Sequence, residues 1–277
     1  MATGVTVRII AEAGENHLGD MDRAAEMVRQ AAASGADFIK FQSFDERDLA
    51  PHVADDTRGW IRRVQLSEDN HHRLYAEAAR HGILFLSTAV NIRWAAFLRE
   101  LGCHQVKLAS LSLTNHALLE YAGRHFDEVF LSTGMGAVEE IDAALAAVGD
   151  RTRVTLLHCV SQYPTPDHDA SLLTVSYLRE RFGRSVGYSD HTIGTVACLA
   201  ACAIGAELIE KHFTLDKTLE GTDHVLSADP AELATIAHGC RRIAGMLGAR
   251  SKQVAAGEAA NREAMRSLFT ADGGGPR

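Results

Sequence analysis

The chain has 277 residues, a formal net charge of −8 and 46% hydrophobic residues, which is typical of a globular protein. No apolar run approaches the roughly 20 residues that a membrane helix needs. No basic stripe indicates nucleic-acid binding, and the first residues show no secretory signal pattern. The five cysteines are odd in number and form no CxxC pair, which favours a reduced, cytoplasmic location.

Short apolar runs rich in β-branched residues predict strands at regular intervals along the chain. They lie at residues 5–10, 38–41, 84–86, 105–108, 128–131, 154–158, 185–188 and 207–211. Segments with helical periodicity lie between or after most of them, at residues 21–34, 69–80, 92–101, 118–125, 138–148, 171–182, 195–204 and 230–247. Several of these helices end at a glycine, the usual left-handed cap.

Eight alternations of strand and helix predict a single-domain α/β protein, a (β/α)8 TIM barrel. A doubly wound open sheet is the structural alternative, but such a sheet rarely contains eight evenly spaced units. We expect the barrel to span residues 1–250. Residues 251–277 are expected to form a last amphipathic helix, within 255–268, and a flexible tail from Asp272 onward.

In a TIM barrel the functional side chains lie at the carboxyl ends of the strands. Two strand ends carry matched triplets, Ser189-Asp190-His191 and Glu210-Lys211-His212. Because side chains alternate along a strand, the serine and histidine of the first triplet share one face, as do the glutamate and histidine of the second. On neighbouring parallel strands these groups would form a site for a divalent metal or a general base.

Every predicted strand ends in polar or ionisable residues. They are Glu12, Lys40, Gln42, Ser87, Thr88, Lys107, Ser110, Ser132, Thr133, His158, Ser189, His191, Glu210 and His212. A lysine in an apolar strand is costly unless it is paired, so Lys40 and Lys107 indicate a phosphate and carboxylate site. After the last strand, Asp223 and His224 are expected to add a carboxylate and an imidazole to the same rim.

Longer motifs cover residues 8 to about 230 in order. They are Ile10-Ala-Glu-Ala-Gly14, Asn16-His17, Lys40-Phe-Gln42, Leu86-Ser-Thr88, Lys107-Leu-Ala-Ser110, Leu131-Ser-Thr-Gly-Met135, Leu157-His-Cys159, Tyr163-Pro-Thr-Pro166, Gly187-Tyr-Ser-Asp-His-Thr192, Glu210-Lys-His-Phe-Thr214 and Gly221-Thr-Asp-His224. Together they resemble the barrel domain of the N-acetylneuraminate (sialic acid) synthase family, which includes legionaminate and pseudaminate synthases.

The resemblance implies a transferase of carbohydrate biosynthesis. Such an enzyme condenses phosphoenolpyruvate with an open-chain sugar aldehyde, releases phosphate and forms a 2-keto-3-deoxy acid. It implies a divalent metal at His191 and His212, typically manganese, with magnesium or cobalt as alternatives. Phosphoenolpyruvate contacts are implied for Lys40, Thr88, Lys107, Ser110, Ser132 and Ser189. Glu12, Gln42, Tyr163, Glu210 and Asp223 would line the metal and sugar side.

The family architecture is a homodimer in which an antifreeze-like C-terminal domain covers the barrel mouth. No such domain is found after residue 268, so a separate lid protein is one expectation. Ser112, Ser161 and Ala89 replace an acidic residue, an asparagine and a proline of the family pattern. The acceptor half of the site is therefore expected to be altered, and the base that activates water would be Glu210 or a metal-bound hydroxide.

Two alternative functions are compatible with the same residues. The first is a Schiff-base aldolase or lyase that uses Lys107 or Lys40 as the nucleophile. The second is a catalytically altered barrel that binds a ligand or a partner protein. Loss of the acidic residue at position 112 favours the second alternative, whereas the retained lysines and histidines favour an enzyme.

Overall fold

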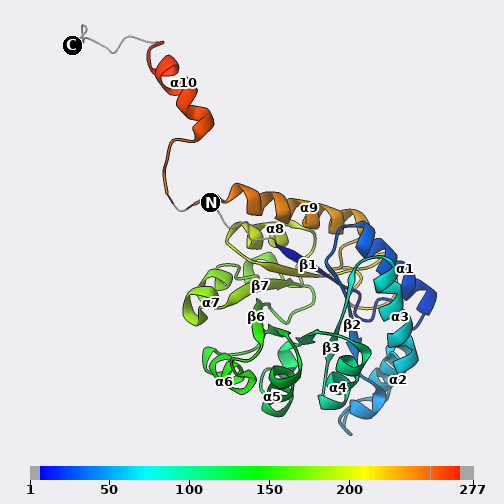
Figure 1. The fold of residues 1–277 in the computed structure, drawn as a ribbon. Coiled ribbons are helices and arrows are strands. Elements are labelled where there is room, and N and C mark those ends of the chain that lie inside the picture. Colours follow the sequence, from blue (N-terminus) through cyan, green and yellow to red (C-terminus); the bar gives the residue numbers. More distant parts are fainter. Residues whose placement is uncertain (1–6, 250, 269–277) are drawn as a thin grey trace. The chain divides into compact units, whose positions relative to one another are not determined.

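The computed structural model describes residues 7–249 and 251–268. Its strands pair in parallel, each with its neighbour along the chain, and β8 closes on β1 to form a barrel (Figure 1). The strands are β1 (Arg8–Glu12), β2 (Phe38–Ser43), β3 (Leu84–Ala89), β4 (Gln105–Leu108), β5 (Glu128–Ser132), β6 (Arg153–His158), β7 (Ser185–Asp190) and β8 (Leu208–His212). The predicted (β/α)8 barrel is therefore confirmed.

Helices follow the strands and surround the barrel (Figure 1). They are α1 (Met21–Ala33), α2 (Asp55–Val64), α3 (Glu68–Arg80), α4 (Ile92–Leu101), α5 (His116–His125), α6 (Val138–Val148), α7 (Thr174–Phe182), α8 (Val196–Ala203) and α9 (Pro230–Met246). Three short 3-10 turns lie at Glu46–Asp48, Ser110–Ser112 and Asp167–Asp169.

Two element predictions need correction. The first strand begins at Arg8 and continues to Glu12, because Glu12 pairs in register with Lys40 of β2 and His212 of β8; residues 5 and 6 of the predicted strand lie outside the described residues. Helix α2 was not predicted. Half of its ten residues are charged, and Val64 is its only fully buried residue; its apolar face is limited to Trp60, Ile61 and Val64, which is shorter than the apolar patterns of the predicted helices.

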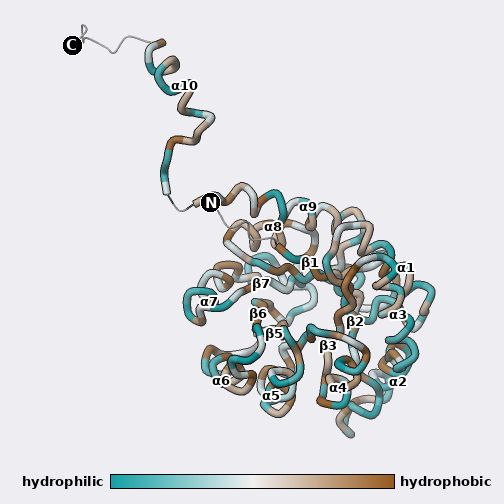
Figure 2. The backbone as a smooth tube through the Cα atoms, viewed as in Figure 1, coloured by the Kyte–Doolittle hydropathy of each residue, from teal (hydrophilic) through white to brown (hydrophobic). Residues whose placement is uncertain are grey.

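The barrel has two separate apolar layers, which follow from the alternation of side chains along each strand. One layer fills the barrel interior and consists of Ile10, Phe38, Leu86, Phe130, Leu157 and Leu208. The other lies between the strands and the helices and includes the intervening residues, such as Ile9 and Ile39. Figure 2 shows hydrophobic residues along strands such as β1 and β2, while the outer helices mix hydrophilic and hydrophobic residues. The interior layer closes the barrel beneath the polar strand ends.

The barrel belongs to a compact unit that ends at Met246, and helix α10 (Ala256–Arg266) belongs to a second unit. This helix lies within the stretch predicted to be the last helix. The predicted tail from Asp272 lies outside the described residues. In residues 7–249 and 251–268 there is no helix with both the length and the apolar character needed to cross a bilayer.

Candidate active site

A cavity of about 600 Å³ opens at the carboxyl ends of the strands. Most of the side chains expected at the mouth line it, contributed by every strand except β6 and by several of the loops that follow the strands, including the loop after β6. These residues are Glu12, Lys40, Gln42, Thr88, Lys107, Ser110, Ser132, Tyr163, Ser189, His191, Glu210, His212 and Asp223. The structure thus brings together groups from both ends of the barrel sequence, from Glu12 to Asp223.

The alternation of side chains explains how these residues reach the cavity. On β2, Phe38 belongs to the interior apolar layer, and Lys40 and Gln42 follow it on the same face. On β8, Leu208 belongs to the interior apolar layer, and Glu210 and His212 follow it on the same face. Each inward face is therefore apolar at the barrel centre and polar at the mouth.

Four polar residues expected at the mouth do not line the cavity. Ser87 hydrogen-bonds to Ser43 on the helix side of the sheet, and Thr133 donates to the Leu157 carbonyl oxygen. The imidazole of His158 contacts the Ala170 carbonyl oxygen at 3.0 Å. These residues directly follow or precede an inward-facing residue, so the pleat turns them outward.

His224 is the fourth residue, and it too is buried away from the cavity. Its Nδ1 lies 2.7 Å from the Thr214 hydroxyl, so only Asp223 of this pair reaches the rim. The loop turns between the two residues, and the imidazole packs under the rim that the carboxylate joins. The expectation that this loop adds both groups was therefore half right.

A buried cluster of two lysines and two glutamates forms the centre of the site. Lys40 Nζ lies 2.8 Å from Glu12 Oε1, 3.8 Å from Glu210 Oε2 and 3.0 Å from the Thr88 hydroxyl. Lys107 Nζ has only Glu210 as an ion-pair partner in the described part of the chain, at 3.5 Å. The donors of Lys40 are thus largely occupied, whereas Lys107 retains donors for a bound anion.

The two carboxyl groups of this cluster differ in acidity. Burial raises the pKa of Glu12, although the Lys40 ammonium group opposes the shift. Burial by itself would raise the pKa of Glu210 as well. The ammonium groups of Lys107 and Lys40 outweigh burial and lower the pKa of Glu210 to about 2. Ser189 donates a 2.8 Å hydrogen bond to Glu210. Glu210 is therefore the stronger acid of the two, and Glu12 is the carboxyl group that takes up a proton more readily.

Two imidazoles lie beside this cluster, with ring centroids 5.4 Å apart. His191 donates through Nδ1 to the Val160 carbonyl oxygen at 2.7 Å, which leaves its Nε2 as a lone-pair donor. The Tyr163 ring lies over His191, with centroids 4.1 Å apart. Burial lowers the pKa of His191 to about 4 and also lowers the pKa of His212, so both rings are neutral at pH 7.

One ring nitrogen of His212 has no hydrogen-bond partner in the described residues. Its Nδ1 is buried without a hydrogen-bond partner, although Asp223 Oδ2 lies 3.3 Å away. Among residues 7–249 and 251–268, no three side chains of His, Cys, Asp or Glu converge as a ready-made metal cage. Two neutral imidazoles with free nitrogen lone pairs nevertheless fit a divalent cation whose other positions are filled by water or substrate.

The sequence matches the NeuB family over residues 27–252, most of the chain. The chain belongs to the NeuB family. It is 37% identical to the N,N'-diacetyllegionaminic acid synthase of Campylobacter jejuni, over 95% of this chain and 84% of that protein. It is 32% identical to the human N-acetylneuraminate-9-phosphate synthase, over 89% of this chain and 72% of that protein.

A solved structure agrees with this assignment of the NeuB-family chain. The N-acetylneuraminic acid synthetase of Leptospira borgpetersenii, crystallised with citrate, superimposes with a TM-score of 0.89 at 35% identity. The match covers 95% of this chain and 92% of that chain. The predicted family and the prediction of a sialic acid synthase-like enzyme are therefore confirmed.

Several residues that line the cavity of this NeuB-family chain were not predicted. Cys159 lies 3.2 Å from the Ser110 hydroxyl, and Glu15 accepts a hydrogen bond from the Trp60 indole. Cys159 is two positions beyond inward-facing Leu157, so strand alternation could have identified it. Glu15 and Trp60 had no comparable signal, because one lies in a loop and the other on the helix that was not predicted.

The three departures from the family pattern lie in different places. Ser161 lines the cavity, close to Gly134. Ser112 is buried, lies outside the cavity lining, and has no hydrogen-bond partner for its hydroxyl oxygen. Ala89 packs in the layer between strands and helices.

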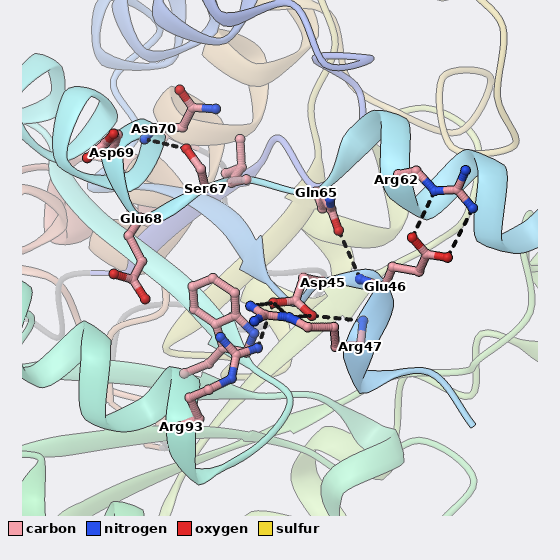
Figure 3. A pocket seen from close by; sticks show the side chains of 12 residues that line it. Asp45, Glu46, Arg47, Arg62, Gln65, Ser67, Glu68, Asp69, Asn70 and Arg93 are labelled. Carbon is pink, nitrogen blue, oxygen red and sulfur yellow. Dashed lines mark hydrogen bonds and ion pairs between the residues drawn. The ribbon is translucent and has the colours of Figure 1, made fainter. Parts of the chain in front are cut away.

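A second cavity, of about 690 Å³, lies at the start of α3 on the outside of the barrel (Figure 3). It is lined by three arginines, but each is already bound to a carboxylate. Arg47 and Arg93 pair with Asp45, and Arg62 pairs with Glu46 at 2.8 Å. This cavity therefore offers no spare positive charge for an anionic ligand.

Gly134 permits the close approach of three polar side chains that line the cavity. A Cβ atom there would lie 2.6 Å from Ser161 Oγ and 2.8 Å from both Cys159 Sγ and Ser110 Oγ. We expect Gly134→Ala to displace Ser110 and lower kcat/KM for phosphoenolpyruvate about tenfold, while overpacking costs about 1–3 kcal/mol of stability. Steady-state phosphate release and thermal unfolding measure the two effects.

Gly257→Ala is the matched control for this substitution, because a Cβ there meets no atom within 4 Å. It should leave both quantities unchanged. Full activity of Gly134→Ala would show that Ser110 need not occupy its observed position.

Proposed function

We propose that this enzyme condenses phosphoenolpyruvate with an open-chain sugar or sugar-like aldehyde, forming a C–C bond and releasing phosphate to give a 2-keto-3-deoxy acid. One observation carries the proposal. Lys40 and Lys107 meet Glu12 and Glu210 in a single cavity beside a pair of neutral imidazoles. The relatives named as N,N'-diacetyllegionaminic acid synthase and N-acetylneuraminate-9-phosphate synthase support the same reaction class.

The anion end of the cavity suits the phosphate and carboxylate of phosphoenolpyruvate. Lys107 supplies an ammonium group with spare donors, and the hydroxyls of Ser110 and Ser132 line the same cavity. Burial lowers the pKa of Lys107 even though Glu210 opposes this shift, so a dianionic ligand would stabilise the charged ammonium. Binding of phosphoenolpyruvate would therefore pair its negative charge with the Lys107 ammonium group in a site shielded from water, where such a pair interacts strongly.

The reaction needs one water molecule for each product formed. C3 of phosphoenolpyruvate attacks the aldehyde carbon, and the resulting alkoxide takes up the proton that Glu12 receives from water in the next step, which returns Glu12 to its carboxylate form. Water adds to the cationic C2 and loses a proton to the carboxylate of Glu12, whose buried Oε2 has no partner of its own. The C–O bond to phosphate then breaks, and the second proton of that water leaves with the phosphate as C2 becomes a ketone.

We propose His191 and His212 as the holders of a divalent cation, with manganese as the first choice and magnesium or cobalt as alternatives. Such a cation would supply Lewis-acid polarisation of the aldehyde. The two imidazoles fit this role because both are neutral at pH 7, and Asp223 adds a carboxylate next to His212. Dimerisation, a lid protein and a cytoplasmic location stay predictions.

The direct test is phosphate release from phosphoenolpyruvate with manganese and a panel of aldoses, with mass spectrometry of the product. The proposal expects a product heavier than the aldose by the mass of pyruvate, with one phosphate released per product. Release of phosphate without such a product would contradict C–C bond formation.

The lowered pKa of Lys107 also favours the Schiff-base alternative. Borohydride reduction in the presence of pyruvate separates the two chemistries, because only the alternative leaves a stable adduct on a lysine. Tight calorimetric binding of phosphoenolpyruvate without turnover of any aldose would instead support a binding protein.

Removing the metal is expected to abolish condensation. After dialysis against a chelator, activity should fall at least a hundredfold and return on titration with manganese. His212→Ala should weaken manganese binding about tenfold or more, measured by calorimetry without substrate. His238→Ala, on α9, is the control and should bind manganese like the wild type. An unchanged affinity of the His212 variant would exclude the imidazole pair as the metal site.

A further inference from the structure

Glu15 places a carboxylate in the cavity that the proposed reaction does not use. It lies in the loop between β1 and α1 and is partly buried at the rim. It accepts a hydrogen bond from the indole N–H of Trp60 through Oε2. In residues 7–249 and 251–268 no lysine, arginine or histidine forms an ion pair with it.

Glu15 is held in place by a rigid partner. Trp60 belongs to α2 and lies close to the β8–α9 loop, because a Cβ atom on Gly221 would be 3.5 Å from its ring. The indole therefore occupies one oxygen of Glu15 and keeps the carboxylate at the rim of the cavity. The second oxygen has no hydrogen-bond partner in the described residues and is not fully buried, so it can accept a hydrogen bond from a ligand.

The surroundings of Glu15 make this end of the cavity negative. Burial raises the pKa of Glu15, the Trp60 hydrogen bond opposes the shift, and the carboxylates of Asp223 and Glu12 add to it. Two further acceptors with no hydrogen-bond partner, Glu12 Oε2 and His212 Nδ1, are buried in the same cavity. Lys40 pairs with Glu12 at 2.8 Å, whereas no lysine or arginine of the described residues pairs with Glu15 or Asp223, so these two carboxylates make their side of the cavity negative.

We propose that Glu15 is a specificity-determining residue that selects acceptors presenting a hydrogen-bond donor, a hydroxyl or a protonated amine, and rejects acceptors carrying a phosphate at this end. This inference rests on the proposed function, because it assigns the acceptor to the end of the cavity away from Lys107. A donor group would satisfy the free oxygen of Glu15. A phosphate beside Glu15 would meet a carboxylate that no lysine or arginine of the described residues neutralises, with the carboxylates of Asp223 and Glu12 adding to the repulsion.

The test compares three aldoses with one carbon skeleton: D-mannosamine, D-mannose and D-mannose 6-phosphate. Calorimetry measures their binding to the metal-loaded enzyme in the presence of phosphoenolpyruvate, and to the Glu15→Gln variant. We expect the wild type to bind mannosamine more tightly than mannose 6-phosphate. The Glu15→Gln substitution should shrink this ratio about tenfold, the effect of one charge-assisted hydrogen bond, and leave phosphoenolpyruvate binding unchanged.

Glu220→Gln is the matched control. Glu220 is an exposed carboxylate of the β8–α9 loop that pairs with Arg63 at 3.0 Å outside the cavity lining, so its removal tests for a general effect of charge. An unchanged ratio in the Glu15 variant, an equal change in the control, or no binding of any of the three aldoses would overturn the inference. Selective aldose binding without phosphate release would support it and contradict only the proposed reaction.

Discussion

Lys107→Met is expected to lower kcat/KM for phosphoenolpyruvate about a thousandfold, the largest effect of any single substitution considered. Loss of one preorganised charge from a site shielded from water typically costs about 3–4 kcal/mol of transition-state stabilisation. Lys107 is almost completely buried, and its only ion-pair partner in the described chain is Glu210, at 3.5 Å. Its charge is therefore available to the substrate rather than used within the protein.

The same substitution should leave the fold intact, because methionine keeps much of the volume of the lysine side chain and removes a buried charge. Phosphate release gives the kinetic effect, calorimetry with phosphoenolpyruvate gives the loss of affinity, and thermal unfolding checks the fold. The control is Lys217→Met, which removes an ion pair with Glu232 at a partly exposed position. If Lys107→Met kept more than a tenth of the wild-type kcat/KM, the anion site would have to be assigned elsewhere.

Lys211→Met is expected to have the largest effect on stability. Lys211 and Asp190 form an ion pair at 2.8 Å, and their side chains are 1% and 0% exposed. Asp190 also accepts hydrogen bonds from the Tyr188 hydroxyl and the Thr192 backbone N–H, and Lys211 donates to the Thr192 carbonyl oxygen. Breaking such a buried pair leaves an uncompensated charge and costs about 3–5 kcal/mol.

For a domain of this size, that loss corresponds to a fall in Tm of about 10 °C. Adding Asp190→Asn should restore part of the loss, because the remaining buried charge is then removed. Lys217→Met again serves as the exposed control and should change the unfolding free energy by less than about 1 kcal/mol. Equal stability of the Lys211 and Lys217 variants would mean that water reaches Asp190.

The ion pair between Lys211 and Asp190 also affects the positions of the two histidines in the cavity. Asp190 and Lys211 point away from the cavity, and each directly precedes one of the two histidines on neighbouring strands. The pair therefore holds His191 and His212 in register across β7 and β8. We expect Lys211→Met to lower kcat/KM even at temperatures where it is fully folded, because the imidazole pair loses its fixed spacing.

The sequence by itself determined the barrel and the polar contents of its mouth. Strands and helices alternate with clear apolar patterns, and residues such as Glu12, Lys40 and His212 lie in local motifs at strand ends. Those features are readable because a parallel barrel places every strand end at one face. The end of β1 could not be predicted from the sequence, because its last residues join the strand through backbone pairing with β2 and β8.

Only the tertiary structure decided which polar residues face the cavity. His158 and Ser87 are polar residues at strand ends, as are Lys40 and Thr88, but a shift of one residue along a strand reverses the face. Contacts between distant segments could not be predicted from the sequence either. One example is the hydrogen bond between Glu15 and Trp60, which are 45 residues apart. Composition and periodicity describe each segment alone, whereas the part of the cavity around Glu15 is formed by segments that meet only when the barrel closes.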